Sequence, residues 1–445
     1  MAEKENRCFE VYSDTIDVKE KLRMNKLIKQ DWFKRHNISI IIYIVLLLSE
    51  ITSNYVIWSL GILYLGCQII RRRGKLVIRR FWGENILFVL ILLGGIIGLK
   101  NVCAGRAETW PYIRDMLHIS SIILVCFFFS NMAERYLYDM SVVYNTVFFF
   151  CGTYSMVITL FAIPNYLEAE SNIYEYIISR VGISESILAI GLYLTFFRSK
   201  IIGEFYVNTY IDRILGIAII IAVMLAFSRT MILFFVSLCA VGLVKHIKQI
   251  FKIFVVILLG ILLITQISPG VIESYGTKIS HSFQEISSSQ PVWNETAIVQ
   301  NWRGYEVYCA KQEYRRFTLL EQILGRGFGA TVDVGDYAYL VTSEDTLPYL
   351  HNGYYTTLIK NGILGIVLIV LYWCSLFYGI KKKSISKYEK DLAWGIVIGM
   401  ALSMFFIHGV FWGGNEEVFY LFLVWLKAKS NCRGNDIKVL GGNIN

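Results

Sequence analysis

The chain has 445 residues and a formal net charge of +9, from 43 Lys and Arg against 34 Asp and Glu. Hydrophobic residues make up 55% of it and charged residues only 17%, whereas soluble proteins contain about 25% charged residues. So many apolar residues exceed what soluble cores bury, which excludes a secreted domain, a disordered chain and an ordinary soluble enzyme. We predict an all-α polytopic membrane protein, and the basic excess does not indicate a nucleic acid partner.

Twelve apolar segments of the sequence are candidates for transmembrane helices, which need about 20 mostly apolar residues. These segments lie at 38–53, 55–70, 84–99, 116–131, 142–163, 183–197, 211–227, 230–246, 252–268, 352–378, 392–411 and 417–427. We therefore expect about 12 transmembrane helices, with short loops between most of them.

Lys and Arg are unevenly distributed between the two sets of loops that alternate along these segments. One set holds eighteen of them and the short loops of the other set hold five. Cytoplasmic loops are enriched in positive charge, so both termini are predicted to be cytoplasmic. The expected organisation is a tail at 1–36, spans one to nine within 37–268, a large extracytoplasmic loop at 269–351, spans ten to twelve within 352–427, and a tail at 428–445.

The large loop at 269–351 is the one extramembrane segment big enough to carry its own structure, and its many aromatic residues argue against disorder. Residues 303–323 predict one amphipathic helix. Its expected apolar stripe consists of Tyr305, Tyr308, Leu319 and Ile323. The cluster Gly325–Gly329 that follows lacks the preceding strand and the Lys-Ser/Thr pair of a nucleotide-binding loop. We interpret it as a tight turn where two backbone segments approach closely.

Cysteine and histidine spacing indicates no metal site, and we expect neither a metal nor another cofactor. Cys103 and Cys309 fall in predicted outer loops, where they could pair in a disulfide or stay unpaired. We expect them to stay unpaired.

Three basic residues fall at the predicted outer ends of helices. Arg229 stands in a Ser-Arg-Thr turn near hydrocarbon depth, where an Arg needs a partner, a wet cavity or a route for its side chain to the interface. Arg303 opens the amphipathic helix, and its alternative role is a solvated surface charge. His351 precedes span ten, and its alternative role is capping or packing.

Spans eight and ten both begin at the predicted outer face, so Arg229 and His351 lie at helix N-termini. Unpaired N–H groups and the helix dipole favour phosphate at such ends. Two such ends with guanidinium groups predict an anion site just above the bilayer, and Arg suits bidentate phosphate contacts. The same field disfavours an imidazolium, which would keep His351 neutral and able to accept a proton.

In their order along the chain, these features resemble the Wzy/WaaL superfamily of membrane glycan polymerases and O-antigen ligases. The matching residues are Ser228-Arg229-Thr230, Trp302-Arg303-Gly304-Tyr305, Gly325 to Gly329, His351-Asn352-Gly353-Tyr354-Tyr355 and Asn361-Gly362-Ile363-Leu364-Gly365. Arg180-Val181-Gly182, at the outer start of span six, is a looser match. The resemblance covers roughly residues 180–380.

The resemblance implies a GT-C-like glycosyltransferase whose donor is an oligosaccharide on undecaprenyl pyrophosphate. It implies that Arg229 and Arg303 hold the pyrophosphate and offset charge on the leaving group. His351 would activate the attacking sugar hydroxyl as a base, or else position the acceptor. The expected substrate-binding residues are Arg180, Arg326, Asn352 and Tyr354. Loop aromatics either stack on sugars or serve the structure, and the second role is expected for most of Trp293, Trp302, Tyr305 and Tyr354.

The function we predict is polymerisation of O-antigen or capsule repeat units at the outer side of the bacterial cytoplasmic (inner) membrane. Expected partners are the lipid bilayer, a chain-length regulator protein and a flippase. One alternative is an O-antigen ligase, which transfers the glycan to lipid A-core. The other is a polysaccharide flippase or secondary transporter, which is disfavoured because the suggestive groups gather at one face and the two halves show no repeat.

Overall fold

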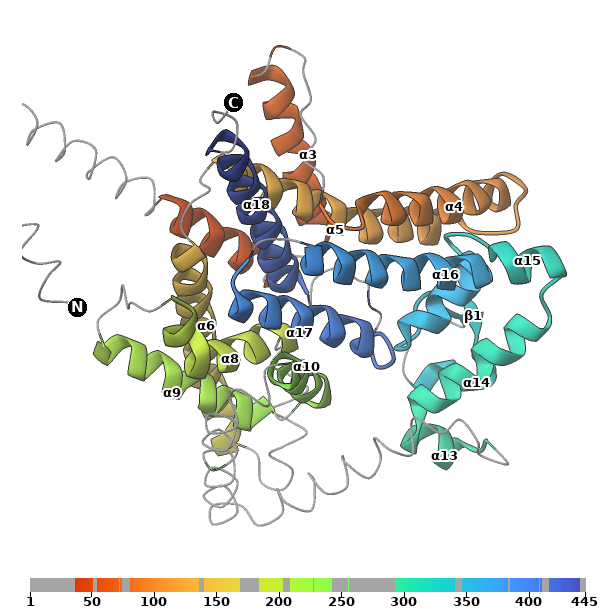
Figure 1. The fold of residues 1–445 in the computed structure, drawn as a ribbon. Coiled ribbons are helices and arrows are strands. Elements are labelled where there is room, and N and C mark those ends of the chain that lie inside the picture. Colours follow the sequence, from red (N-terminus) through yellow and green to blue (C-terminus); the bar gives the residue numbers. More distant parts are fainter. Residues whose placement is uncertain are drawn as a thin grey trace, which may run out of the picture.

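The computed structural model describes residues 37–50, 54–71, 81–135, 140–168, 184–202, 209–226, 228–241, 293–340, 346–382, 385–407 and 416–440, together with residues 73, 255 and 409. Within these residues the chain is almost entirely helical (Figure 1). A first helix, Asn37–Glu50, precedes the labelled helices. The bundle helices are α3 Asn54–Arg71, α4 Glu84–Cys103, α5 Thr109–Arg135, α6 Met140–Glu168, α8 Glu185–Ile202, α9 Thr209–Ala226, α10 Arg229–Ala240, α16 Gly353–Lys382, α17 Lys387–Ser403 and α18 Glu417–Leu440.

Five described helices are long and apolar enough to cross a membrane. These are Glu84–Cys103, Thr109–Ala133, Met140–Leu160, Thr209–Ala226 and Gly353–Lys381. They coincide with predicted spans three, four, five, seven and ten, and they support the all-α membrane class. The expected number of about 12 spans stays a prediction, because span nine lies outside the described residues except for Val255.

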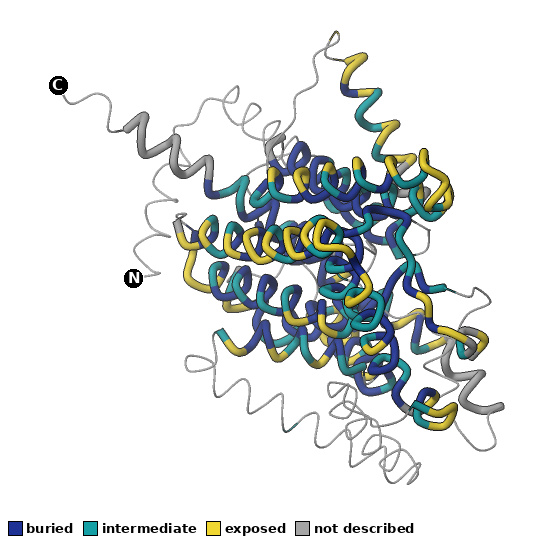
Figure 2. The backbone as a smooth tube through the Cα atoms, turned by 90° about the vertical axis from the view of Figure 1, so that its right-hand side faces the viewer, coloured by how far each residue is buried: buried dark blue, intermediate teal, exposed yellow. Residues whose placement is uncertain are grey.

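Contacts between helix ends agree with the two sides of the membrane to which the sequence assigns the loops. Asn101, near the end of α4, donates its side-chain N–H to the carbonyl of Arg326 in the large loop at 2.7 Å. At the opposite helix ends, Lys429 of α18 pairs with Glu389 at the start of α17 at 2.6 Å. Each contact joins segments that the sequence places on the same side. Figure 2 shows buried residues on inward faces of the bundle and exposed residues on outward faces.

The described part of the large loop, from residue 293 onward, contains the α-helices α13 Glu295–Gln300, α14 Trp302–Arg315 and α15 Leu319–Leu324. They lie together beyond one end of the bundle (Figure 1). The loop also contains the short strands β1 Val332–Asp333 and β2 Thr346–Leu347, which pair antiparallel, and the 3-10 helix η1 Gly335–Leu340. For the residues that the structure describes, the all-α prediction therefore holds apart from this small strand pair.

The single helix predicted over 303–323 is wrong, because two helices with different starts occupy it. Thr318 forms a capping box with Glu321: the Thr318 hydroxyl accepts from the Glu321 N–H at 3.3 Å, and the Thr318 N–H donates to the Glu321 carboxylate at 2.8 Å. This reciprocal pair starts α15 afresh. The second half of the predicted apolar stripe is also wrong, since Leu319 and Ile323 are 76% and 44% exposed.

Tyr305, from the first half of that stripe, does lie in a small core beneath the loop helices. It is 7% exposed and its ring centroid lies 5.3 Å from that of Trp293 and 5.9 Å from that of Trp302. These three aromatic residues therefore have the structural role that was expected for most of the loop aromatics. The other buried members of this core are Ile298, Cys309, Ala310, Phe317, Val332, Val334, Leu347, Leu350 and Ile359.

The glycine-rich segment is the close backbone approach that the sequence predicts. Gly327 has a φ of +81°, its N–H donates to the carbonyl of Lys360 at 2.8 Å, and a Cβ there would lie 2.1 Å from the nitrogen of Gly98. The next residue, Phe328, donates its N–H to the carbonyl of Gly94 at 2.9 Å. The loop is thus inserted between α4 and α16, where a side chain at Gly327 has no room.

Asp115 of α5 holds the inserted loop in place. Its carboxylate, which is 0% exposed, pairs with the ammonium of Lys360 and accepts the N–H of Gly329 at 2.7 Å and the hydroxyl of Tyr349 at 2.5 Å. Burial, with the added repulsion of the Asp115 charge, raises the pKa of Tyr349, so the phenol stays protonated and donates. One buried carboxylate therefore holds α5, the glycine loop and the start of α16 together.

Loss of the Lys360 ammonium should lower the free energy of unfolding of the protein. In Lys360→Met the buried Asp115 charge loses its counter-charge, which typically costs about 3–5 kcal/mol. We expect a clearly lower thermal unfolding temperature of the detergent-solubilised protein. The double variant Asp115→Asn/Lys360→Met should lose less than Lys360→Met alone, and a single variant as stable as the parent would contradict the anchoring role.

Candidate functional site

His351 and Glu306 form the central polar pair of the site. The Nδ1 atom of His351 lies 2.8 Å from Oε1 of Glu306, and the backbone N–H of His351 donates to Oε2 at 2.8 Å. The indole N–H of Trp302 donates to Oε1 of the same carboxylate at 2.5 Å. Glu306 is 2% exposed, while the His351 side chain remains 36% exposed. The imidazole is therefore held by Glu306 and remains partly exposed.

The sequence positions this carboxylate through the first turn of α14. Asn301 caps the helix, since its side-chain oxygen accepts the N–H of Gly304 at 2.9 Å. Trp302 and Glu306 then stand four residues apart on one helix face, where their side chains meet. The capped turn thus presents the carboxylate to His351, which comes from a segment 45 residues further along the chain.

This arrangement fixes which nitrogen of a neutral His351 can accept a proton. A carboxylate accepts hydrogen bonds, so Nδ1 carries the hydrogen that faces Glu306. The lone pair is then on Nε2, the nitrogen that does not face Glu306. A neutral imidazole oriented by a buried carboxylate is the arrangement that general-base catalysis uses.

A cavity of about 480 Å³ lies in front of His351. It is lined by Leu233, Arg303, Val307, Lys311, His351, Asn352, Tyr354, Tyr355, Leu402, Phe405 and Phe406. Its cationic lining residues, Arg303 and Lys311, belong to α14. Its apolar lining residues include Leu402 near the end of α17 and Phe405 just after it, which are 41% and 53% exposed. The structure thus brings two of the predicted catalytic residues, Arg303 and His351, into one cavity.

Arg229 lies at the edge of the same region, one helical turn before the cavity-lining residue Leu233. Its neighbour Ser228 donates its hydroxyl to Glu185 at 3.3 Å, and Glu185 also interacts electrostatically with Arg303. The starts of α8, α10 and α14 therefore converge on Glu185. Arg229 itself is not among the described residues that line the cavity, so the predicted convergence of its guanidinium with Arg303 and His351 stays a prediction.

Asn352 and Tyr354 hold the start of α16 in place. The side-chain oxygen of Asn352 accepts the N–H groups of Tyr354 and Tyr355 at 3.1 and 3.2 Å, and its amide donates to the carbonyl of Phe405 at 3.3 Å. The Tyr354 hydroxyl donates to the carbonyl of Ala401 at 2.8 Å. Both residues also line the cavity, so their predicted role in substrate binding stays a prediction beside these structural contacts.

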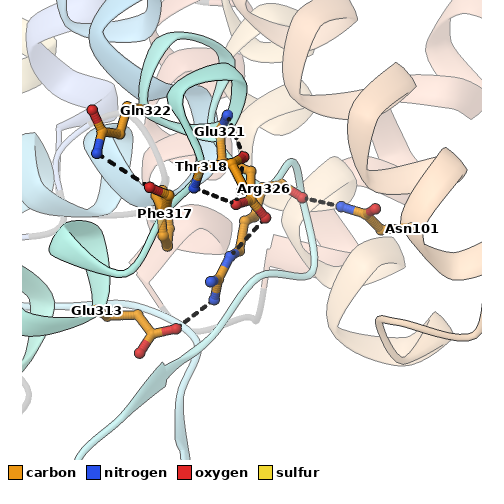
Figure 3. Close-up of polar contacts among 7 residues, drawn as sticks. All are labelled: Asn101, Glu313, Phe317, Thr318, Glu321, Gln322 and Arg326. Carbon is orange, nitrogen blue, oxygen red and sulfur yellow. Dashed lines mark hydrogen bonds and ion pairs between the residues drawn. The ribbon is translucent and has the colours of Figure 1, made fainter.

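Arg326, another predicted substrate-binding residue, is engaged within the loop (Figure 3). Its guanidinium pairs with Glu313 and, at 3.2 Å, with Glu321, and it lies 4.1 Å from the ring centroid of Phe317. Arg326 is not among the residues that line the cavity. Its role in substrate binding stays a prediction, as does that of Arg180, which lies outside the described residues.

Cys103 and Cys309 are both free thiols, as predicted. Burial raises the pKa of Cys309 to about 11, so this thiol is protonated at neutral pH. It therefore lacks the thiolate that a cysteine nucleophile needs.

Two residues of the site escaped the sequence analysis. Glu306 carries a signal that could have found it, because it stands four residues after Trp302 in the very turn that contains Arg303. Lys311 lies two helical turns after Arg303, so helical periodicity places both residues on the same face of the helix. The sequence alone does not show which segment of the chain packs against that side of the helix.

Comparison with protein families identifies one match. A sequence model of the Wzy_C family, described as O-antigen ligase, matches residues 214–370. This segment contains Arg229, Arg303, Glu306 and His351, and it confirms the predicted relation to the Wzy/WaaL superfamily. It supports an O-antigen ligase or polymerase type of membrane enzyme in general. A comparison with curated proteins finds no significant match.

Replacing Glu306 should change the tautomer of His351. In Glu306→Gln the charged acceptor of the Nδ1 hydrogen is lost, and we expect the Nε2–H tautomer to gain population. Solution or solid-state ¹⁵N NMR of histidine-labelled protein measures this directly, with His351→Gln to assign the signal. A spectrum of His351 that is unchanged in Glu306→Gln would contradict the orienting role.

Proposed function

We propose that the protein is a membrane glycosyltransferase that polymerises O-antigen or capsule repeat units carried on undecaprenyl pyrophosphate. The proposal places the cavity at the outer side of the bacterial cytoplasmic membrane, in a GT-C-like bundle of about 12 spans with both termini cytoplasmic. In the cell we propose a chain-length regulator protein and a flippase as its partners.

The observation that carries the proposal is the mixed lining of the cavity. It combines the cations Arg303 and Lys311 with the apolar residues Leu402, Phe405 and Phe406. A prenyl pyrophosphate has the same two parts, an anionic head and a hydrocarbon chain. Guanidinium groups bind phosphate oxygens in planar, charge-assisted pairs, and the exposed apolar end of α17 offers the chain a path toward lipid.

The chemistry follows from the side of His351 that faces the cavity. Nε2 accepts the proton of the attacking sugar hydroxyl as its oxygen bonds to the anomeric carbon of the donor. The bond from that carbon to the pyrophosphate breaks, and the electron pair leaves on the phosphate oxygen. Arg303 and Arg229 stabilise the charge that develops there, and Glu306 stabilises the imidazolium that forms.

O-antigen ligase is the second candidate, since that is the description of the matching family. The two activities differ in the acceptor. Cells lacking a ligase accumulate long lipid-linked polymer, whereas cells lacking a polymerase contain no product beyond one repeat unit.

The direct test uses purified protein with a lipid-linked repeat unit and no nucleotide or metal. We expect a ladder of products from the parent protein and no elongation by His351→Ala, because the proton acceptor is gone. Equal amounts of both proteins in the membrane fraction serve as the control for expression. A normal ladder from His351→Ala would refute the role of this residue, and no ladder from the parent would refute the polymerase.

Replacing Arg303 should slow the same reaction without unfolding the protein. In Arg303→Met we expect turnover to fall about 10²–10³-fold, because a preorganised positive charge on the leaving group is lost. Arg315→Met is the matched control, since Arg315 is exposed on the same helix and does not line the cavity. Equal loss in both variants would show that the effect is one of general charge.

A further inference from the structure

The short loop helix α15 carries an apolar patch that faces away from the protein. The patch consists of Leu319, Leu320 and Ile323, which share one helix face and are 76%, 64% and 44% exposed. The acidic residue of the same helix points toward the loop instead, since Glu321 binds Arg326 at 3.2 Å (Figure 3). The helix is therefore polar toward the protein and apolar toward its surroundings, the reverse of a helix on a water-exposed surface.

Contacts of α15 and of the glycine segment after it fix the level of this patch on the bundle. A Cβ at Gly327 would lie 2.1 Å from the nitrogen of Gly98, within the uncharged run of α4 that ends before Lys100. A Cβ at Gly362 would lie 2.4 Å from the carbonyl oxygen of Ile323, where the uncharged run of α16 begins. Both helices are long and apolar enough to cross a membrane. The end of α15 therefore lies where these spans enter hydrocarbon.

The apolar patch of α15 adjoins the apolar exposed face of α16. Ile363 directly follows Gly362, against which Ile323 lies, and it is 51% exposed. Further along α16, Val367 and Val370 are 46% and 50% exposed. Exposed apolar residues along a membrane-spanning helix contact lipid, because they gain nothing from water. The patch is thus placed to continue the lipid-facing surface of α16.

Basic residues stand directly before the patch. Arg315 and Arg316 are both exposed, and the side chain of Arg316 is 73% exposed. Arg316 lies 3.6 Å from Glu313, and Arg326 also pairs with Glu313 and with Glu321. Three guanidinium groups thus face two carboxylates, which leaves a positive charge beside the patch. A positive charge next to an apolar surface complements an anionic phospholipid.

An exposed tryptophan marks the same level on the neighbouring helix. Trp110, in the first turn of α5, is 58% exposed. It stands two residues before Tyr112, whose backbone nitrogen would lie 3.1 Å from a Cβ at Gly329. Tryptophan is enriched where membranes meet water. The glycine segment, and with it the end of α15, therefore lies at the level of this ring.

We propose that α15 is an interfacial helix of the loop-side leaflet. Leu319, Leu320 and Ile323 insert among the acyl chains beside α16, and Arg315 and Arg316 bind the headgroups of anionic phospholipids. The loop, which the sequence places outside the membrane, then returns to the bilayer just after the last residue of α14. Since the first turn of α14 carries Arg303, the bilayer holds one end of the helix whose other end lines the cavity.

Photocrosslinking in lipid nanodiscs identifies what surrounds the patch. p-Benzoylphenylalanine replaces Leu320 in one variant of the full chain, Val370 in a second and Tyr339 in a third. The nanodiscs contain equal amounts of phosphatidylglycerol and phosphatidylcholine, and mass spectrometry identifies the adducts. We expect phospholipid adducts at 320 and at 370, and none at 339. Tyr339 is the matched control, because it is 65% exposed in the same loop but bonded to Glu295 of α13.

The headgroup contact has its own readout in the lipid composition of the adduct at 320. We expect phosphatidylglycerol to exceed phosphatidylcholine about fivefold for each bound positive charge. The ratio should fall toward one in Arg315→Gln/Arg316→Gln and stay unchanged in Lys387→Gln, which removes an exposed charge at the opposite helix ends.

Four results would overturn the proposal. The label at 320 could give no lipid adduct while that at 370 does, which would place the patch in water. It could crosslink to a second copy of the chain, which would make the patch a contact between copies. Equal lipid adducts at 320 and 339 would show that the whole loop lies near lipid without a specific insertion. A lipid ratio unchanged in Arg315→Gln/Arg316→Gln would refute the headgroup contact.

Discussion

The carboxylate of Asp115 binds three groups that lie more than 200 residues further along the chain. Lys360 comes from α16, the Gly329 N–H from the glycine loop, and the Tyr349 hydroxyl from the segment just before α16. A fully buried charge is tolerated only with such partners, and removing one leaves a penalty of about 3–5 kcal/mol. This interaction therefore fixes how the large loop sits on the bundle.

The anchored segment leads directly into the site. Tyr349 stands two residues before His351, so the contact that satisfies Asp115 also limits where the imidazole can lie. A second buried carboxylate, Glu306, then orients the ring. Asp115 sets the position of the backbone, and Glu306 sets the direction and tautomer of the side chain. The rigidity needed for proton transfer thus comes from two carboxylates with different tasks.

Much of this arrangement could be predicted from the sequence, and the reasons for the rest are physical. Long apolar runs identify helices because the hydrocarbon thickness sets their length, and Gly325–Gly329 identifies a close approach because few other residues adopt its φ values. The break at Thr318 was missed because the apolar period continues across it while the capping box starts a new helix. Arg326 pairs with Glu313 of α14 and Glu321 of α15. These pairs depend on how the two helices meet, which no local sequence pattern encodes.

The most direct test of the account is a cryo-electron microscopy structure of the protein in lipid nanodiscs with undecaprenyl pyrophosphate. We expect phosphate density against Arg303 and the start of α10, within reach of Nε2 of His351, and prenyl density along Phe405 and Phe406. Phosphate density elsewhere on the protein, or a prenyl chain that does not enter beside α17, would contradict it.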